Sequence, residues 1–168
     1  MTTRSAPPTG RVGIFPGSFD PLTNGHVDIV LRSAHLFEKV VVAVLVNPDK
    51  KPLFTPDERV AIIGEVFREY PNVEVDTFDG LLVDYARTRR ASAIIRGIRA
   101  VSDFEFEFQM AAMNRHLGPE VETIFMTPAE QFTFISSSLV REIAVLGGDV
   151  RQFVHPAVET ELKKLKRK

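Results

Sequence analysis

The chain alternates between short runs of β-branched residues and segments whose apolar residues recur every three to four positions. The short runs predict strands over residues 11–16, 39–46, 73–78, 91–96 and 121–126. The helical period predicts helices over residues 24–37, from residue 55 onward, and over 81–90, 136–146 and 156–168. The helix from residue 55 has a buried stripe of Val60, Ile63, Phe67 and Tyr70. The run at 39–46 is apolar at nearly every position, which is typical of a parallel strand covered on both faces.

Strands separated by helices indicate an α/β protein with a doubly wound, Rossmann-like, five-stranded parallel sheet in a single domain. Right-handed crossovers favour the strand order 3-2-1-4-5. In that order strands one and four are neighbours at the switch point, where ligands bind beyond the carboxyl ends of the strands. The two most unusual loops, residues 17–26 and 96–99, follow these strands, so we expect them to meet at one crevice.

Two helices have recognisable starting signals. Thr55 and Glu58 form a capping box with Pro56 in the first turn, and Ser102 and Glu105 form a second one. Residues 104–108 alternate with period two, which locally favours a strand, but the capping box and the run to residue 116 favour a helix, and we predict a helix. Its apolar residues would lie on two sides, with Phe104, Phe108 and Ala111 on one and Phe106, Met110 and Met113 on the other. Such a helix is usually buried on both sides, which indicates a subunit interface.

Composition narrows the class of protein. Among 168 residues, 21 Lys and Arg nearly balance 22 Asp and Glu, which argues against a bulk nucleic-acid binder. The absence of Cys excludes disulfides, thiolate catalysis and Cys-ligated zinc. No apolar stretch reaches the roughly 20 residues that a membrane span needs, and residues 1–10 lack the apolar core of a secretory signal. We expect a cytoplasmic protein with a flexible arm over residues 1–10, one domain over 11–168, and neither a membrane nor nucleic acid as partner.

The segment from Phe15 to His26 passes from a strand to the start of a helix. Free backbone N–H groups and the helix dipole favour an anion at such a place. Gly17 permits close backbone approach to a ligand, Ser18 offers a hydroxyl, and His26 can donate a hydrogen bond to a phosphate. An ordinary turn with a capping Thr or Asn would use the same residue types, so composition leaves both interpretations open.

Three later segments also carry polar chemistry. Lys50, after the second strand, is either a mobile charge that reaches a phosphate or part of a solvated loop. Arg96 directly follows a buried run, so its guanidinium needs a charged partner, and a phosphate in the crevice would supply one. Ser136, Ser137 and Ser138 either cap a helix or form a second phosphate cradle with Arg141 one turn further on. Cations therefore gather near strands one and four, while the acids mostly lie on helices elsewhere.

Four segments together resemble one family. Thr23-Asn24-Gly25-His26 resembles the T/H-x-G-H signature of the nucleotidylyltransferase superfamily, and the longer run PGSFDPLTNGH at 16–26 is similar to the bacterial phosphopantetheine adenylyltransferases. Three further segments match that family in order, namely KKP at 50–52, IRGIR at 95–99 and ISSSLVR at 135–141. The resemblance covers about residues 11–160, and the joint occurrence is specific where each segment alone would be weak. Ser18 is a small departure, because Thr is also common there, and both keep a hydroxyl.

The resemblance implies transfer of the adenylyl group of ATP to 4′-phosphopantetheine, giving dephospho-coenzyme A and pyrophosphate. It implies His26 as a transition-state stabiliser. It also implies acceptor contacts at Ser18, Lys50, Leu82 and Arg96, and ATP contacts at Ser18, Phe19, His26, Gly97, Ile98, Arg99, Glu107, Phe132, Thr133, Phe134, Ile135, Ser136, Ser137 and Ser138. A homohexamer is implied as well. The sequence has no His or carboxylate spacing for a metal held by the protein, so Mg²⁺ would arrive with ATP.

Two alternatives stay open at this point. One is another adenylyl- or cytidylyltransferase of the same fold, such as one that uses nicotinamide mononucleotide, which the loops after strands two and four argue against. The other is a nucleotide-binding sensor or structural subunit without turnover, against which His26, Lys50, Arg96 and Arg99 argue together. An attacking phosphate is already a nucleophile, so neither a strong protein base nor a covalent intermediate is required, and positioning with electrostatics suffices.

Overall fold

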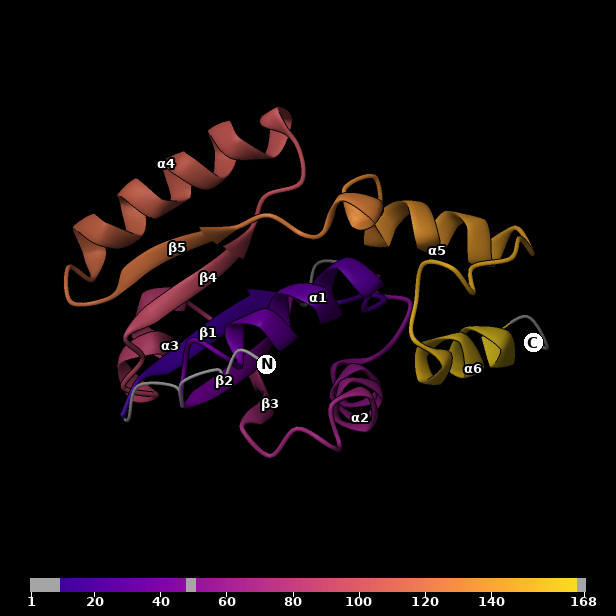
Figure 1. Ribbon diagram of the computed structural model, residues 1–168, viewed down its shortest axis with the longest axis horizontal. Coiled ribbons are helices and arrows are strands. Elements are labelled where there is room, and N and C mark those ends of the chain that lie inside the picture. Colours follow the sequence, from indigo (N-terminus) through magenta and orange to yellow (C-terminus); the bar gives the residue numbers. More distant parts are fainter. Residues whose placement is uncertain (1–9, 48–50, 166–168) are drawn as a thin grey trace, which may run out of the picture.

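Five parallel strands form one sheet in the order β3-β2-β1-β4-β5, as the sequence predicts (Figure 1). The computed structural model describes residues 10–47 and 51–165. The strands are β1 (Val12–Gly17), β2 (Lys39–Leu45), β3 (Val73–Phe78), β4 (Ala93–Gly97) and β5 (Glu122–Met126). The helices are α1 (Asn24–Ser33), α2 (Pro56–Val66), α3 (Leu82–Thr88), α4 (Val101–Leu117), α5 (Ser137–Val145) and α6 (Pro156–Leu165), with a short 3₁₀ helix, η1 (Glu130–Phe132). The predicted arm over residues 1–10 lies, apart from Gly10, outside the described residues.

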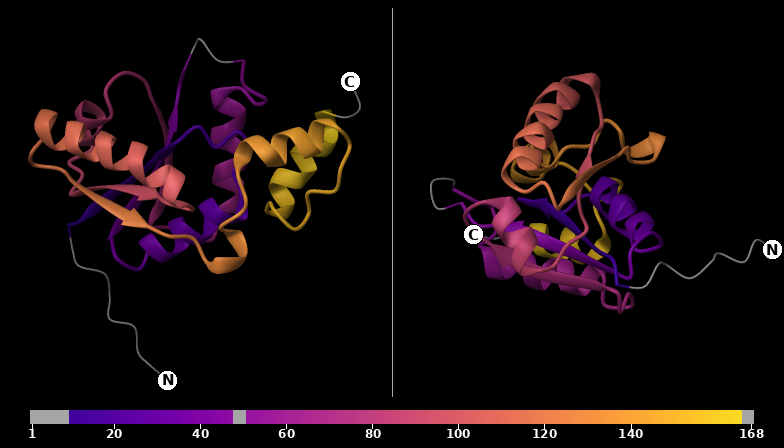
Figure 2. Two further views of the ribbon diagram at one scale, coloured as in Figure 1. Left: turned by 90° about the horizontal axis from the view of Figure 1, so that it is seen from above. Right: turned by 90° about the vertical axis from the view of Figure 1, so that its left-hand side faces the viewer.

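Each face of the sheet has its own core. Val40, Val42 and Val44 point to the side covered by α1, α2, α5 and α6, whereas Val41 and Ala43 pack on the side of α3. All five residues are fully buried, which confirms that the run at 39–46 is a central strand covered on both faces. Figure 2 shows α4 at the opposite end of the molecule from α5 and α6. Among the described residues, no helix has both the length and the apolar character to cross a bilayer.

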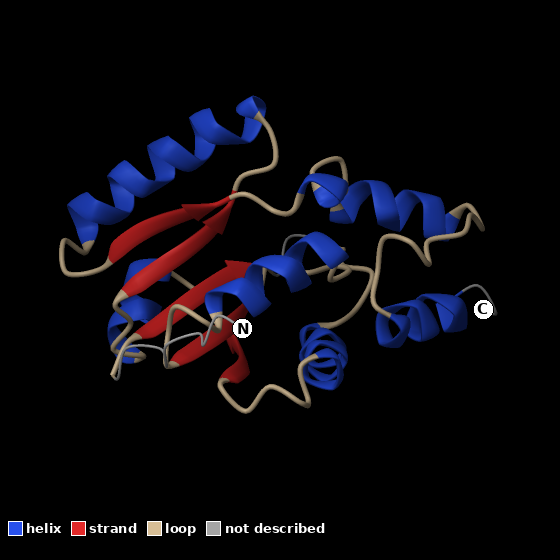
Figure 3. Cartoon of the chain, viewed as in Figure 1, coloured by secondary structure: helices blue, strands red, loops and turns tan. Residues whose placement is uncertain are grey.

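Strands β1 and β4 pair over a short distance. β1 matches β2 at six positions, but it matches β4 only at Gly13 with Ala93 and at Ile14 with Ile94. Beyond these pairs the two strands diverge toward their carboxyl ends (Figure 3). The divergence opens space at the predicted switch point, which is where the loops after β1 and β4 begin.

The starts of α2 and α4 test the two predicted capping boxes. The first is confirmed, because Thr55 N–H donates to Glu58 Oε2 at 2.8 Å and Glu58 N–H donates to Thr55 Oγ1 at 3.2 Å. The second is wrong, because α4 begins at Val101, with Ala100 as N-cap and no capping side chain. Ser102 therefore lies inside the first turn, two residues after the N-cap, where its hydroxyl is too late to cap.

One prediction about helix burial is also wrong. Tyr70 is 40% exposed, because α2 ends at Val66 and residue 70 lies in the turn that follows. Residues 104–108 do belong to a helix, but α4 is not covered on two sides within this chain. Phe106 is 61% exposed and Phe108 58%, and the buried residues of α4 are Glu107 and Asn114.

Candidate active site

A cavity of about 350 Å³ lies at the carboxyl ends of β1 and β4. Three segments that are far apart in the sequence line it, namely the loop from β1 into α1, the loop from β4 into α4, and the start of α5. It contains these predicted site residues: Ser18, Phe19, His26, Arg96, Gly97, Arg99, Glu107, Ile135, Ser136, Ser137 and Ser138. The structure thus brings together the two loops that the sequence predicted to meet.

His26 is the third residue of α1, and its ring takes part in the capping box that starts this helix. Its Nδ1 accepts a hydrogen bond from the Thr23 N–H at 3.0 Å. A ring nitrogen that accepts a hydrogen bond carries no proton, so the neutral ring carries its proton on Nε2. Burial, and to a lesser degree the positive charge of Arg99, lower the pKa of His26 from 6.5 to about 4. At pH 7 this side chain is therefore a neutral donor through Nε2–H.

The turn at Gly17, Ser18 and Phe19 is tightly packed. A Cβ atom at Gly17 would lie 2.8 Å from Cζ of Phe19, so glycine is needed there to make room for the Phe19 ring, a close approach within the protein itself. That ring packs edge-on against the His26 ring, with centroids 5.2 Å apart. Phe19 has a φ of 48°, in the left-handed region that non-glycine residues rarely adopt. The turn is thus an unusual backbone arrangement beside the cavity.

Arg96, at the end of β4, has a charged partner within the protein. Its Nε and Nη2 donate to the two carboxylate oxygens of Glu107 at 2.7 and 2.5 Å, and its Nη1 donates to the Pro16 carbonyl at 3.1 Å. The sequence interpretation expected a phosphate in this place, and it did not foresee that Glu107, one of the two buried residues of α4, would pair with Arg96. The contact with Pro16 joins the ends of β4 and β1 where the strands no longer pair. A guanidinium has five N–H donors, so two remain for a ligand.

Arg99 connects the loop after β4 with the segment before α5. Its Nε donates to Asp103 Oδ2 at 3.2 Å, and its Nη1 donates to the Ile135 carbonyl at 2.9 Å. Asp103 lines the cavity but was not a predicted site residue, although its position four residues after Arg99 on a helix is a usual spacing for an ion pair. Both arginines of the cavity are therefore held by carboxylates of α4.

The three serines at the start of α5 have different partners. Ser136 is the N-cap, because its hydroxyl accepts from the Leu139 N–H at 3.1 Å. Ser137 donates from its hydroxyl to the Pro21 carbonyl at 2.9 Å, which fastens α5 to the loop after β1. Ser138 is exposed and lines the cavity. The capping interpretation thus holds for Ser136, while Ser138 and the free N–H groups of the first turn stay available to an anion.

Other predicted site residues lie away from the cavity wall. Leu82 starts α3 and packs against the core on that side of the sheet. Ile98, Phe132, Thr133 and Phe134 are not among the residues that line the cavity, and Phe134 is 64% exposed. Lys50 lies outside the described residues. Within the described part of the chain, no group of three or more His, Asp or Glu side chains is placed to hold a metal ion.

The chain matches known proteins over most of its length. The family model for cytidylyltransferase-like proteins matches residues 14–143. A phosphopantetheine adenylyltransferase of Bordetella pertussis is 60% identical over 152 residues, which cover 90% of both chains. The protein of the same name from Alkaliphilus metalliredigens is 54% identical over 154 residues, covering 92% of this chain and 98% of that one.

Among solved structures, a nicotinic acid mononucleotide adenylyltransferase of Plasmodium falciparum complexed with NaAD superposes with a TM-score of 0.66 at 15% identity. The match covers 93% of this chain and 96% of that one, and at this identity it shows the shared fold. The sequence relatives are far more similar and agree in name. With His26 lining the crevice between β1 and β4, this chain belongs to the phosphopantetheine adenylyltransferase family of cytidylyltransferase-like proteins.

Proposed function

We propose that this enzyme transfers the adenylyl group of ATP to 4′-phosphopantetheine in one direct displacement. An oxygen of the acceptor phosphate attacks the α-phosphorus of ATP, and the bond from that phosphorus to the oxygen bridging to the β-phosphate breaks. The products are dephospho-coenzyme A and pyrophosphate, with no covalent link to the protein. The activity follows from the family, and the mechanism is our proposal.

One observation carries the mechanism: a neutral His26 lines the same cavity as two arginines and a helix N-terminus. Its Nε2–H can donate to an oxygen of the reacting phosphate, where negative charge grows during the displacement. Neutral imidazole suits a donor that keeps its proton throughout the reaction. In this role His26 positions and stabilises, and the phosphate nucleophile needs no base.

Our proposal divides the cavity residues between the two substrates. We assign Arg99 and the start of α5, with Ser138, to the phosphates of ATP, because free helix N–H groups and a guanidinium converge there. Arg96, with its two remaining donors, is assigned to the acceptor phosphate together with Ser18. Lys50 stays a predicted acceptor contact. Leu82 and the residues from Phe132 to Phe134 stay predictions that concern the outer parts of the two substrates.

The side chains that line the cavity are compatible with Mg²⁺ that is held by the phosphates of ATP. The two carboxylates that line the cavity, Asp103 and Glu107, are already paired with Arg99 and Arg96. Mg²⁺ usually keeps several waters and is held by substrate phosphates, where it would neutralise part of their charge. We therefore assign no protein ligand to the metal.

We also propose that α4 packs against other copies of the chain in a homohexamer. Its exposed large apolar residues include Phe104, Phe106, Phe108 and Met113, between 47% and 61% exposed. An apolar patch on this scale is typical of an interaction site. Location in the cytoplasm stays a prediction.

Acceptor-dependent pyrophosphate release tests the proposed function. The purified protein is given ATP, Mg²⁺ and, in separate reactions, 4′-phosphopantetheine, nicotinamide mononucleotide or no acceptor. We expect release with 4′-phosphopantetheine alone. Release with nicotinamide mononucleotide instead would support a related transferase, and ATP binding without any release would support a sensor, so either result would refute the proposal.

A further inference from the structure

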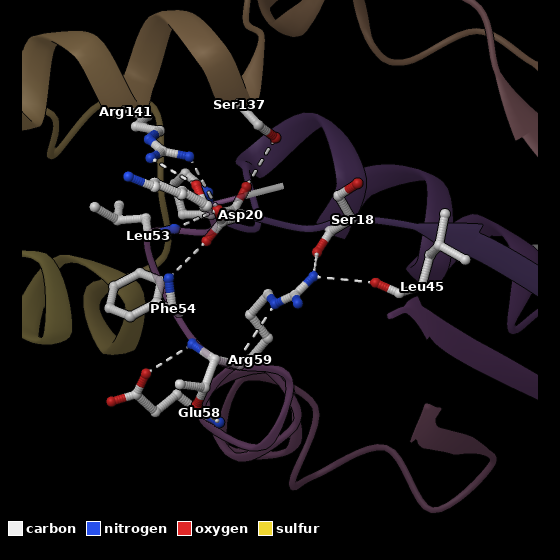
Figure 4. A network of polar contacts seen from close by, with 12 residues as sticks. Ser18, Asp20, Leu45, Leu53, Phe54, Glu58, Arg59, Ser137 and Arg141 are labelled. Carbon is white, nitrogen blue, oxygen red and sulfur yellow. Dashed lines mark hydrogen bonds and ion pairs between the residues drawn. The ribbon is translucent and has the colours of Figure 1, made fainter. Parts of the chain in front are cut away.

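Arg59 is a buried cation that the proposed reaction does not use. It lies on α2, is 5% exposed, and does not line the cavity. Its Nη1 donates to the Ser18 carbonyl at 2.7 Å and to the Leu45 carbonyl at 3.4 Å, and its Nε donates to the Thr55 carbonyl at 3.4 Å (Figure 4). Burial lowers the pKa of Arg59, and the nearby charge of Asp20 partly offsets this. Burying a charged side chain costs free energy, so the burial of Arg59 beside this loop needs an explanation.

Asp20 belongs to the same turn, and like Arg59 it lines not this cavity but a neighbouring hollow that shares Ser18, Ser137 and Ser138 with it. Its Oδ2 accepts from the Leu53 N–H at 2.7 Å and its Oδ1 from the Phe54 N–H at 2.9 Å. Arg141 of α5 donates to Oδ2 at 3.3 Å and to the Lys51 carbonyl at 3.2 Å. Figure 4 shows Asp20 at the centre of these contacts, between α5 and the segment before α2. The carboxylate thus joins three parts of the chain.

Between these two anchors lies Phe19 with its φ of 48°. Such a conformation persists where the surrounding structure holds it from both sides. The C=O and N–H of a trans peptide point in opposite directions, so a Ser18 carbonyl aimed at Arg59 turns the Phe19 N–H to the other side of the loop. Ser18 and Phe19 both line the cavity, and the Phe19 N–H has no backbone acceptor in the described part of the chain.

We infer that Arg59 and Asp20 are positioning residues, which clamp the turn at Ser18 and Phe19 so that its N–H and hydroxyl groups face the reacting phosphates. This inference rests on the proposed function. The planar guanidinium of Arg59 is essential to this role, because its Nε and Nη1 together reach carbonyls of the loop, of β2 and of the N-cap of α2. A lysine keeps the charge but offers a single nitrogen, so it cannot span the same acceptors.

The test compares Arg59→Lys and Asp20→Asn with control variants on α3 and β3, at residues that do not line the cavity. Arg87→Lys removes a guanidinium that likewise binds a backbone carbonyl, that of Leu117 at 2.5 Å. Asp76→Asn removes a carboxylate that accepts from the Tyr85 hydroxyl at 2.7 Å and from Arg89 at 3.4 Å. For each variant, kcat and both KM values come from pyrophosphate release, and thermal unfolding confirms that the protein is folded at the assay temperature.

We expect kcat to fall at least about tenfold in Arg59→Lys and in Asp20→Asn, because small displacements of groups at a reacting centre cost up to about a hundredfold. The KM for ATP should change less than about threefold, since contacts from the loop after β4 and from α5 remain. The controls should match the wild type. Because both residues hold one turn, the double variant should lose little beyond the more affected single variant.

Three results would overturn the inference: kcat within twofold of the wild type in both variants, an equal fall in the controls, or fully multiplicative losses in the double variant. Failure of the proposed function has a different signature, because the wild type itself would then release no pyrophosphate with 4′-phosphopantetheine.

Discussion

Replacing His26 by Ala and by Gln separates the contact of its ring with substrate from its role at the start of α1. Both changes remove the Nε2–H donor. Ala also leaves the Thr23 N–H without its acceptor, and Thr23 is buried at 2% exposure. Gln is a favoured residue at the third position of a capping box, where its side chain accepts from the N-cap N–H. The two variants therefore share the loss of the donor and differ in the cap.

The magnitudes follow from these contacts. Loss of one preorganised donor to developing charge costs on the order of 10²–10³ in kcat, and we expect this in both variants. Loss of the cap costs on the order of 1 kcal/mol, which we expect in His26→Ala alone. Both changes remove the ring that packs against Phe19 at the edge of one core but leave every core residue in place, so both proteins should fold.

Pyrophosphate release measures kcat, and urea unfolding at pH 7.5 measures the free energy of unfolding. Turnover within tenfold of the wild type in His26→Ala, which has no side-chain donor, would remove His26 from the reaction. Unchanged stability in His26→Ala would show that the bond from the Thr23 N–H to Nδ1 contributes nothing as a cap. A large kcat loss in His26→Gln at unchanged stability is the result that the structure predicts.

Other consequences concern pH, an ion pair and the apolar helix. The pKa of His26 is lowered to about 4 from 6.5, so the unfolded chain takes up this proton first. The free energy of unfolding of the wild type, measured in urea, should therefore fall from pH 6.5 toward pH 4 relative to that of His26→Gln, by at most about 1.4 kcal/mol per pH unit. The same pH dependence in both proteins would contradict this. Glu107→Gln deprives Arg96 of its carboxylate and should lower the free energy of unfolding by about 2 kcal/mol in the same assay; an unchanged value would make the pair energetically neutral. Phe106→Glu should alter the stability of the single chain by less than about 0.5 kcal/mol but dissociate the proposed hexamer in sedimentation velocity; an intact hexamer would place Phe106 outside the interface.

The sheet could be predicted because its signals are local and agree with one another. The run at 39–46 is apolar on both faces, and the structure confirms it as β2, in which residues 40–44 are fully buried. The two loops with unusual composition follow strands one and four, and the strand order then requires them to meet. Thr55 with Glu58 is a complete capping box, and both of its hydrogen bonds are present.

The remaining features depend on distant contacts that periodicity does not report. Ser102 with Glu105 has the same spacing as the first box, but α4 begins two residues earlier than that box requires, with Ala100 as N-cap. Arg59 stands in an amphipathic helix where a charged residue usually faces solvent, and its burial depends on carbonyls of two other segments. Glu107 lies among exposed aromatic residues in the sequence, yet the direction of α4 turns it toward β4.

The near-neutral charge of the chain is compatible with a site for two polyanionic substrates because of how the cavity holds its cations. The sequence pattern placed most acids away from the site, but Asp103 and Glu107 of α4 lie within it and pair with Arg99 and Arg96. Each pair fixes a guanidinium before substrate arrives, which lowers the entropy lost on binding. Each guanidinium also keeps donors for a phosphate, since three of its five N–H groups are used within the protein. We therefore expect the site to recognise phosphates through N–H donors held in fixed directions rather than through an excess of positive charge. The neutral ring of His26, which offers Nε2–H, is another such donor.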